Sequence, residues 1–255
     1  MSTAGVEFAK VSYTLPGSAD GQAGRVLLRD ISLELAAGTT TALLGRSGSG
    51  KTTLLRTVNG LLTPTSGEVL VAGKATRDYD TVELRRSIGY VIQGTGLFPH
   101  MTVERNAGMA LELAGRSKQE IAARVKEVLA LAGLEYEEFR ARYPWQLSGG
   151  QRQRVGLARA LATDPMVLLM DEPFGALDPL TRAEMQSMLL ELLQRVRKTV
   201  LLVTHDLDEA LYLADRVVFL AEGAVVVDMP PEDILGSDNP YVKHYVSAVH
   251  RVAPI

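Results

Sequence analysis

One loop in the sequence has residue types and spacing that suit phosphate binding. Residues 45–52 read GRSGSGKT, which matches the pattern G-x-x-x-x-G-K-[ST]. The glycines allow backbone N–H groups to turn inward around phosphate oxygens, and the N-terminus of the following helix adds a partial positive charge. In this pattern Lys51 reaches the β- and γ-phosphates and the Thr52 hydroxyl ligates Mg²⁺. The loop follows an apolar strand and opens a helical pattern, so it has the context that the motif requires.

A second candidate is an apolar strand that ends in two carboxylates. The run 167–170 (VLLM) precedes Asp171 and Glu172. Because ligands of a parallel sheet bind at the carboxyl ends of its strands, we expect Asp171 to face the Mg²⁺ of a bound nucleotide, directly or through water. Glu172 is the better candidate for the general base that holds the attacking water. Taken alone, the segment is also compatible with two solvated acids at a strand end.

A third candidate is the turn LSGGQ at residues 147–151. Ser148 and two glycines stand at the start of a helical pattern, where N–H groups can bind an anion. One nucleotide does not need two phosphate sites in one chain, so we expect this turn to serve a nucleotide held by another copy. The alternative is a capped helix start after a glycine turn.

The elements that must position these residues alternate between strand and helix patterns. Helical patterns cover 52–59 and 181–197, most of 102–160, and the end of the chain. Within them, Ser117-x-x-Glu120 is a capping box and Gly133 a natural helix end. Such alternation predicts a mainly parallel sheet. The predicted strands are 6–13, 31–35, 39–44, 67–73, 88–93, 166–170 and 200–203, with a hairpin of 217–220 and 224–228 around Glu222-Gly223.

Composition narrows the possible functions of this 255-residue chain. Its 27 Lys and Arg against 30 Asp and Glu give a net charge of −3, a poor footprint for a nucleic-acid binder. The absence of cysteine excludes disulfides and thiolate chemistry. The longest apolar runs are far shorter than the ~18–20 residues of a membrane span, and the N-terminus lacks the layout of a signal peptide. We therefore expect any membrane role to depend on a partner.

Taken together, the motifs resemble those of ATP-binding-cassette (ABC) ATPase subunits over nearly the whole chain. The phosphate loop, LSGGQ and the acidic strand occur in the family's order. Gln93 stands at the place of the family's Q-loop, residues 176–178 (ALD) match its D-loop, and His205 stands at the place of its switch histidine. Tyr13 stands where the family stacks an aromatic ring on adenine, although it could also be a core aromatic. Gly175 departs from the Ser that the family often has, which removes no catalytic group.

The resemblance implies ATP and Mg²⁺ as ligands and a role for each site residue. Ser148 and Gly150 would close over the ATP of a facing subunit, and Asp178 would communicate across that interface. The catalytic residues would be Glu172, His205, Gln93 and Lys51, and the metal ligands Thr52, Gln93 and Asp171. The ATP-binding set would be Tyr13, Gly45, Arg46, Ser47, Gly48, Ser49, Gly50, Lys51, Thr52, Thr53, Gln93, Asp171, Ser148, Gly149, Gly150, Gln151, Asp178 and His205.

The resemblance also implies an α/β fold, with a P-loop NTPase core, a mainly parallel sheet, an N-terminal antiparallel β subdomain and an inserted helical subdomain. The core would comprise 1–93 and 161–235, the helical subdomain 94–160, and a C-terminal helical segment 236–255. The chain ends about 50 residues after His205, so we expect no folded regulatory domain within it. His100, His244 and His250 are expected to be structural or solvated, and Trp145 and Met109 to be packing residues.

The resemblance favours an ATPase that powers a membrane transporter. Residues 97–99 (LFP) would expose apolar surface where the family receives a short helix of the membrane subunit. The runs 88–103 and 171–182 are most similar to bacterial importer ATPases of the osmoprotectant class, which move glycine betaine, choline, carnitine or proline betaine. Partners would be a second copy, permease subunits and a substrate-binding protein, with the chain cytoplasmic on the inner face of the membrane. Importers of amino acids or sulfonates, and a soluble ABC-type ATPase acting on nucleic acid or ribosomes, are the alternatives.

Overall fold

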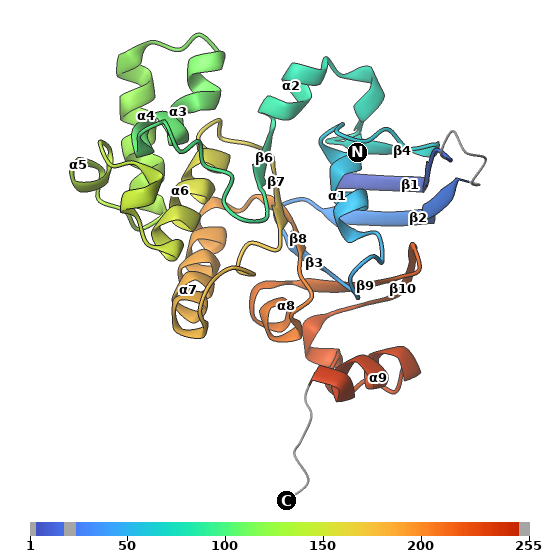
Figure 1. The fold of residues 1–255 in the computed structure, drawn as a ribbon. Helices are drawn as coiled ribbons and strands as arrows, with labels where there is room; N and C mark the ends of the chain where they lie inside the picture. Colours follow the sequence, from blue (N-terminus) through green and yellow to red (C-terminus); the bar gives the residue numbers. More distant parts are fainter. Residues whose placement is uncertain (1–3, 18–23, 250–255) are drawn as a thin grey trace, which may run out of the picture. The chain divides into compact units, whose positions relative to one another are not determined.

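The computed structural model of the chain describes residues 4–17 and 24–249 (Figure 1). The chain divides into two compact units, the first formed by Met1–Tyr79 with Leu201–Ile255 and the second by Asp80–Val200. The expected helical subdomain, 94–160, falls within the second unit. The central part of the expected loop at 16–24, and the last six residues of the expected C-terminal segment with His250, lie outside the described residues.

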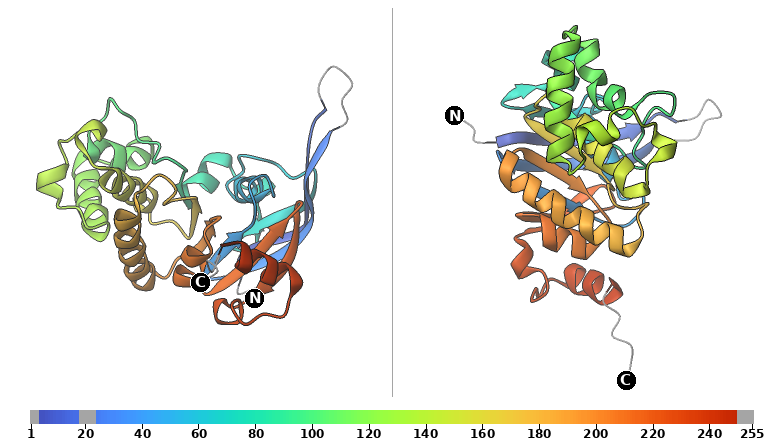
Figure 2. Two further views of the ribbon diagram at one scale, coloured as in Figure 1. Left: turned by 60° about the horizontal axis from the view of Figure 1, so that its bottom comes forward. Right: turned by 90° about the vertical axis from the view of Figure 1, so that its left-hand side faces the viewer.

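The first unit contains a four-stranded antiparallel sheet in the order β2-β1-β4-β5. Phe8 of β1 lies opposite Leu33 of β2 and Val69 of β4, and all three side chains are buried. The paired β1 and β2 are drawn in blue in Figure 2. This sheet is the expected antiparallel β subdomain. Its strands are β1 (Ala4–Leu15), β2 (Arg25–Ala36), β4 (Ser66–Val71) and β5 (Lys74–Ala75).

The same unit contains strands in the order β10-β9-β3-β8, with β3 and β9 parallel. All five residues of β3 are buried, as is typical of a central strand. The hairpin of β9 and β10 turns at Glu222 and Gly223, as predicted, and both residues have a positive φ. The strands are β3 (Thr40–Leu44), β8 (Thr199–Val203), β9 (Arg216–Ala221) and β10 (Ala224–Met229).

Three α-helices lie in the described part of the first unit. The helix α1 follows β3 through the glycine-rich loop, and α8 follows β8. The helix α9 packs through Val242 and Tyr245 into a core cluster that also contains Phe219 and Leu207. The bounds are α1 (Lys51–Val58), α8 (Leu207–Leu213) and α9 (Pro240–Val249), with short 3₁₀ turns η1 (Thr76–Asp78) and η3 (Pro231–Asp233).

The second unit combines a parallel strand pair with six helices. Strands β6 and β7 run parallel from the pair Ile88 and Val167 to the pair Val91 and Met170. The helices α3, α4 and α6 pack on one another (Figure 2). The bounds are α2 (Thr81–Arg86), β6 (Ile88–Val91), α3 (Val103–Leu113), α4 (Lys118–Leu131), α5 (Tyr136–Phe139), η2 (Pro144–Gln146), α6 (Gly149–Leu161), β7 (Val167–Asp171) and α7 (Pro179–Val196).

The predicted fold class is confirmed: the chain is α/β, with mostly parallel strands, a separate antiparallel sheet and helices. The capping box at Ser117 and Glu120 is present. Two short helices, α2 and α8, were not predicted, because each has too few residues for a clear helical periodicity. Within residues 4–17 and 24–249, no helix is both long and apolar enough to span a membrane.

Candidate functional site

The phosphate loop in the first unit is built around glycines and a buried lysine. The ammonium Nζ of Lys51 donates hydrogen bonds to the carbonyl oxygens of Gly45, at 2.7 Å, and Arg46, at 3.1 Å. Gly50 has a φ of 105°, and a Cβ there would lie 2.8 Å from the carbonyl oxygen of Leu27. The close approach and the left-handed backbone therefore both require glycine at this position.

Two features of the loop fit a bound phosphate group. The N-terminal end of α1 has no side-chain cap, since its N-cap residue is Gly50. No side chain therefore competes with an anionic acceptor at this end of the helix. The hydroxyl of Ser49 is buried and makes no hydrogen bond within the described part of the chain. A phosphate oxygen would accept a hydrogen bond from the Ser49 hydroxyl, so the residues present fit the triphosphate of a nucleotide.

Further site residues of the first unit lie close to its last helix. His205 directly follows β8 and Thr204, and its carbonyl oxygen accepts a hydrogen bond of 2.9 Å from the Tyr245 hydroxyl. Nη2 of Arg46 lies 3.0 Å from Nε2 of His244, so His244 makes a polar contact with the loop. A cavity of about 820 Å³ adjoins the loop, lined by residues 46–49, part of β2 and the β9–β10 turn. Tyr13 is half-buried in β1 opposite Leu28, and its contact with adenine stays a prediction.

The second unit brings Gln93, which follows β6, close to the two predicted acidic residues at the end of β7. The Gln93 amide Nε2 donates to Oε2 of Glu172 at 3.2 Å. Asp171 is only 4% exposed, and the Tyr90 hydroxyl lies 3.4 Å from its Oδ2. Because β6 and β7 are parallel neighbours, the residues that follow them meet at one edge. Gln93, Asp171 and Glu172 are thus placed together, and Tyr90 is a neighbour that sequence reasoning missed.

Glu172 has a backbone conformation that is uncommon for its residue type. Its φ is 46°, in the left-handed region that non-glycine residues rarely adopt. Strained backbone of this kind clusters at functional sites, where the surrounding structure holds it in place. The side chain is half-buried, and a Cβ at Gly175 would lie 3.8 Å from its Oε2. Glu172 is therefore held in a defined direction at the end of β7.

The loop after Gln93 is fixed by an arginine of α6. Gly94, Thr95 and Gly96 all have positive φ, so the loop turns sharply. Arg159 donates from Nη1 to the carbonyl oxygen of Gly96, at 2.7 Å, and from Nη2 to that of Thr95, at 3.0 Å. Burial lowers the pKa of Arg159, but its guanidinium remains a cation. Sequence reasoning missed Arg159; its signal was an arginine between two apolar alanines.

The LSGGQ turn forms the N-terminus of α6 and packs against the start of α7. Ser148 Oγ accepts from the N–H of Gln151 at 3.2 Å, and Gln151 Oε1 accepts from the N–H of Ser148 at 2.9 Å. A Cβ at Gly150 would lie 2.7 Å from Cγ2 of Thr181 in α7, so the approach requires glycine. Asp178 caps α7, and hydrogen bonds from the Thr181 side chain and backbone lower its pKa. The LSGGQ turn and Asp178 therefore lie close together.

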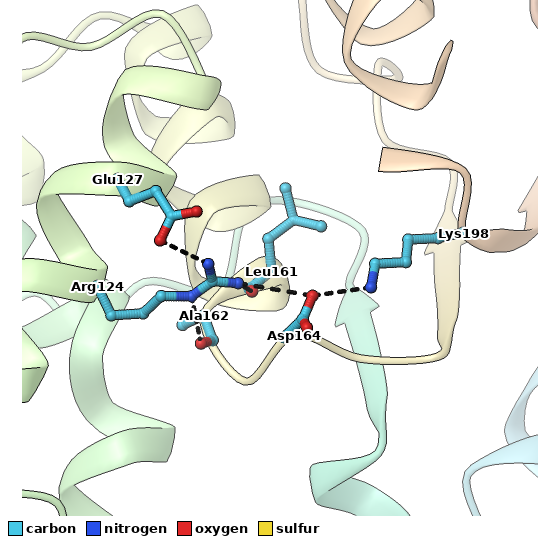
Figure 3. A network of polar contacts seen from close by, with 6 residues as sticks. All are labelled: Arg124, Glu127, Leu161, Ala162, Asp164 and Lys198. Carbon is cyan, nitrogen blue, oxygen red and sulfur yellow. Dashed lines mark hydrogen bonds and ion pairs between the residues drawn. The ribbon is translucent and has the colours of Figure 1, made fainter. Parts of the chain in front are cut away.

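The other end of α6 is fixed by a network of polar contacts (Figure 3). Arg124 of α4 donates to the carbonyl oxygens of Leu161 and Ala162, both at 3.0 Å. Lys198 Nζ lies 2.8 Å from Oδ1 of Asp164, and this hydrogen bond is the main cause of the lowered pKa of Asp164. Arg124 thus satisfies two carbonyl groups that a helix C-terminus leaves without partners.

The loop before α3 carries an exposed aromatic ring on a rigid backbone. Phe98 is 38% exposed, as predicted, and Leu97 is half-buried. The buried Asn106 accepts from the Phe98 N–H at 2.8 Å and donates to the carbonyl oxygens of Phe98, Met101 and Thr102 at 3.0–3.1 Å. These four hydrogen bonds hold the loop in one shape, so the ring is presented at a fixed position.

One packing prediction is wrong. Trp145 is 66% exposed and stacks on Tyr143, with ring centroids 4.5 Å apart, rather than filling the core. The short turn η2 places it on the surface, three residues before Ser148. Met109 is partly buried in α3, and His100 is exposed beside Phe98.

Comparison with known proteins agrees with the geometry of both units. The chain is 45% identical over 218 residues to the osmoprotectant import ATP-binding protein OsmV of Salmonella typhimurium, covering 85% of this chain and 57% of that protein. It is 48% identical over 208 residues to the glycine betaine uptake system ATP-binding protein YehX of Escherichia coli, covering 82% of this chain and 67% of that protein. This chain is shorter than these relatives and spans just over half of the length of OsmV.

A solved structure and a family profile extend the comparison. A dimeric ATP-binding cassette in a post-hydrolysis state, bound to ADP and Pi, matches the chain with a TM-score of 0.78 and 36% identity, covering 89% of this chain and 98% of that one. The ABC transporter profile matches residues 28–175, which contain the phosphate loop, the LSGGQ turn, Asp171 and Glu172. The chain therefore belongs to the ABC transporter family.

Proposed function

We propose that this chain hydrolyses ATP and powers a membrane importer of a small solute. The observation that carries the proposal is the pairing of Gln93 with Glu172 beside the buried Asp171. A carboxylate with a fixed direction, next to a second carboxylate and an amide, is suited to hold and deprotonate a water molecule. We keep the division into a core of 1–93 and 161–235, a helical subdomain 94–160 and a segment 236–255 as part of the proposal.

ATP binds through its phosphates to the loop at 45–52 and to Thr53. The loop amides, the α1 N-terminus and the Lys51 ammonium supply positive charge and N–H donors. Mg²⁺, when bound, neutralises charge on the phosphate oxygens, and Thr52, Gln93 and Asp171 are the residues that would hold it. Lys51 must exchange its bonds to loop carbonyls for bonds to phosphate oxygens.

In hydrolysis, Glu172 accepts a proton from the attacking water and Gln93 orients that water. His205 contacts the γ-phosphate. Phosphoryl transfer requires little covalent chemistry from the protein, so the main contributions are position and charge. The backbone of Glu172 and its contact with Gln93 provide the position.

Two copies of the chain bind two ATP molecules head to tail, each between the phosphate loop of one copy and the Ser148 turn of the other. The dimeric relative with bound ADP and Pi supports this arrangement. Ser148, Gly149, Gly150 and Gln151 would contact the facing nucleotide, and the nearby Asp178 would carry the signal between the copies. Tyr13 would stack on adenine.

The importer would contain permease subunits and a substrate-binding protein, with this chain in the cytoplasm on the inner face of the membrane. The Phe98 loop supports the permease contact, because it presents a rigid and exposed apolar ring. The names of the relatives OsmV and YehX support an osmoprotectant or glycine betaine as the solute. Importers of other small solutes are the second candidate. The net charge of −3 disfavours action on nucleic acid.

ATPase assays and light scattering on Glu172→Gln test this proposal. Loss of the general base should lower kcat by ~10²–10⁴-fold and trap the ATP-bound dimer. We expect the mass to shift from monomer to dimer when MgATP is added, and Ser148→Arg in the same background to abolish the shift. Full turnover by Glu172→Gln would refute the assigned base. A monomer with ATP bound at high concentration would refute an ATP-driven dimer of the isolated chain.

A further inference from the structure

The helix α9 contacts two residues of the proposed ATPase site through consecutive side chains. Nε2 of His244 lies 3.0 Å from Nη2 of Arg46 in the phosphate loop. The next residue, Tyr245, donates its hydroxyl to the carbonyl oxygen of His205 at 2.9 Å. One helix therefore contacts both the loop that holds phosphate and the segment that carries the γ-phosphate histidine.

The helix is itself held firmly by aromatic packing. The ring of Tyr245 lies edge-to-face on Phe219, with centroids 5.2 Å apart, and the ring of Tyr241 does the same at 5.9 Å. Val242 is fully buried in the same cluster. Because the ring of Tyr245 is immobilised by its neighbours, its hydroxyl can restrain the carbonyl of His205 without a further loss of side-chain freedom.

Tyr245 is the donor in one of these contacts, and His244 is the acceptor in the other. Burial raises the pKa of Tyr245 to about 12, so its hydroxyl carries a proton and donates at neutral pH. Arg46 has only donors, so its contact with His244 requires the unprotonated Nε2 as the acceptor.

We propose that α9 is a positioning element of the ATPase site, in which Tyr245 fixes the main chain at His205 and His244 restrains the Arg46 side chain. This inference rests on the proposed function. Tyr245 and His244 act through other residues, so they are positioning residues. Displacement of α9 would then alter the phosphate loop and the histidine together.

Tyr245→Phe in the full chain tests the first contact. The substitution keeps the ring on Phe219 and removes only the hydroxyl. We expect kcat for MgATP to fall by about three- to tenfold, the value of one hydrogen bond, while KM stays within about twofold. The matched control is Tyr241→Phe, because the Tyr241 hydroxyl has no hydrogen bond among the described residues and its ring packs on the same Phe219. A kcat equal to that of the control would overturn the inference.

His244→Leu and His244→Gln test the second contact. Leucine removes the acceptor, so we expect KM for MgATP to rise by about two- to fivefold, since Arg46 is then unrestrained in the loop. Glutamine offers an amide oxygen to the same guanidinium and should restore most of the KM. An unchanged KM in His244→Leu, or the same rise in both variants, would contradict a positioning role of His244.

Amide hydrogen exchange separates this inference from the proposed function. In the wild-type chain without nucleotide, the amides of 204–209 should exchange more slowly than in Tyr245→Phe, and Tyr241→Phe should resemble the wild type. Equal exchange in all three chains would overturn the inference whatever the ATPase activity. A wild type that hydrolyses no MgATP would refute the proposed function while leaving the exchange result to decide the role of α9.

Discussion

Each unit has one candidate anion site at the N-terminus of a helix, and the two helix termini are capped differently. At the start of α1, the N-cap residue is Gly50 and no side chain accepts from the helix. At the start of α6, Ser148 and Gln151 satisfy each other in a capping box. No side chain competes with a ligand at the start of α1, whereas part of the α6 terminus is already bonded to the Ser148 and Gln151 side chains.

The difference shows how one helix terminus can be a strong site and the other a weak one. A ligand at α1 gains a hydrogen bond to the buried Ser49 hydroxyl, which has no partner among the described residues. An anionic ligand at α6 must compete with the Ser148 oxygen for the N–H of Gln151. We therefore expect ATP to bind first and tightly at the phosphate loop, and the Ser148 turn to contribute only when a second copy brings the nucleotide to it.

The largest expected effect comes from removing the positive charge of Lys51 at the phosphate loop. Lys51→Ala should lower kcat/KM for MgATP by ~10²–10³-fold, a typical loss for one preorganised donor. Steady-state ATPase assays measure it. The matched control is Arg56→Ala, an exposed cation in the last turn of the same helix, which should keep nearly full activity. Comparable losses in the two variants would mean that α1 is sensitive to any lost cation, and would break the distinction between the two sites.

Much of this contrast could be predicted from the sequence, because it depends on local spacing. The glycines and Lys51 of the phosphate loop, and the Ser148 turn before a helix, are contiguous motifs, and the structure places each at a helix start. The strand that ends at Asp171 was found by its apolar run. The resemblance implied a shared metal and water site for Gln93, Asp171 and Glu172, and the structure places the Gln93 amide 3.2 Å from Glu172.

What the sequence did not predict depends on contacts between distant segments. Arg159 contacts a loop 63 and 64 residues away, and Tyr245 contacts His205 from 40 residues away. Neither belongs to a local motif, so its partner could not be identified by spacing. Trp145 was expected to be a packing residue, but it stacks on Tyr143 at the surface, a contact that its sequence neighbours do not reveal.

The anchor of α6 at its C-terminal end gives the next largest effect. Arg124→Ala leaves the carbonyl groups of Leu161 and Ala162 without their charged donor, so we expect a loss of about 2 kcal/mol in the free energy of unfolding. Urea denaturation measures this. Arg116→Ala is the control, because Arg116 forms only an exposed ion pair with Glu120 and should cost at most about 0.5 kcal/mol. Equal losses would show that the carbonyl contacts do not stabilise α6.

Removing the cap at the other end of α6 should have a smaller effect on stability. Ser148→Ala removes the side-chain acceptor of the Gln151 N–H, which should cost about 1 kcal/mol in the free energy of unfolding. Binding of MgATP to the monomer should not change, because the phosphate loop is intact. Isothermal titration on the monomeric chain checks this. A weaker monomer affinity would mean that the Ser148 turn already contributes to ATP binding within one chain, contrary to the comparison.

The smallest effect should come from the charge of Asp164, which joins the same end of α6 to Lys198. The hydrogen bond from Lys198 lowers the pKa of Asp164, so its carboxylate stabilises the folded chain above the pKa of the unfolded state and loses this contribution as the pH falls through the folded pKa. The Asp164 side chain is largely exposed, and Asp164→Asn should therefore cost at most about 0.5 kcal/mol at pH 7. Asparagine also tolerates the positive φ of 53° at this position. The difference between wild type and variant, measured by urea denaturation, should shrink as the pH is lowered below about 4, near the reference pKa of aspartate. A difference that persists there would mean that Asp164 acts through its backbone geometry and not through its charge.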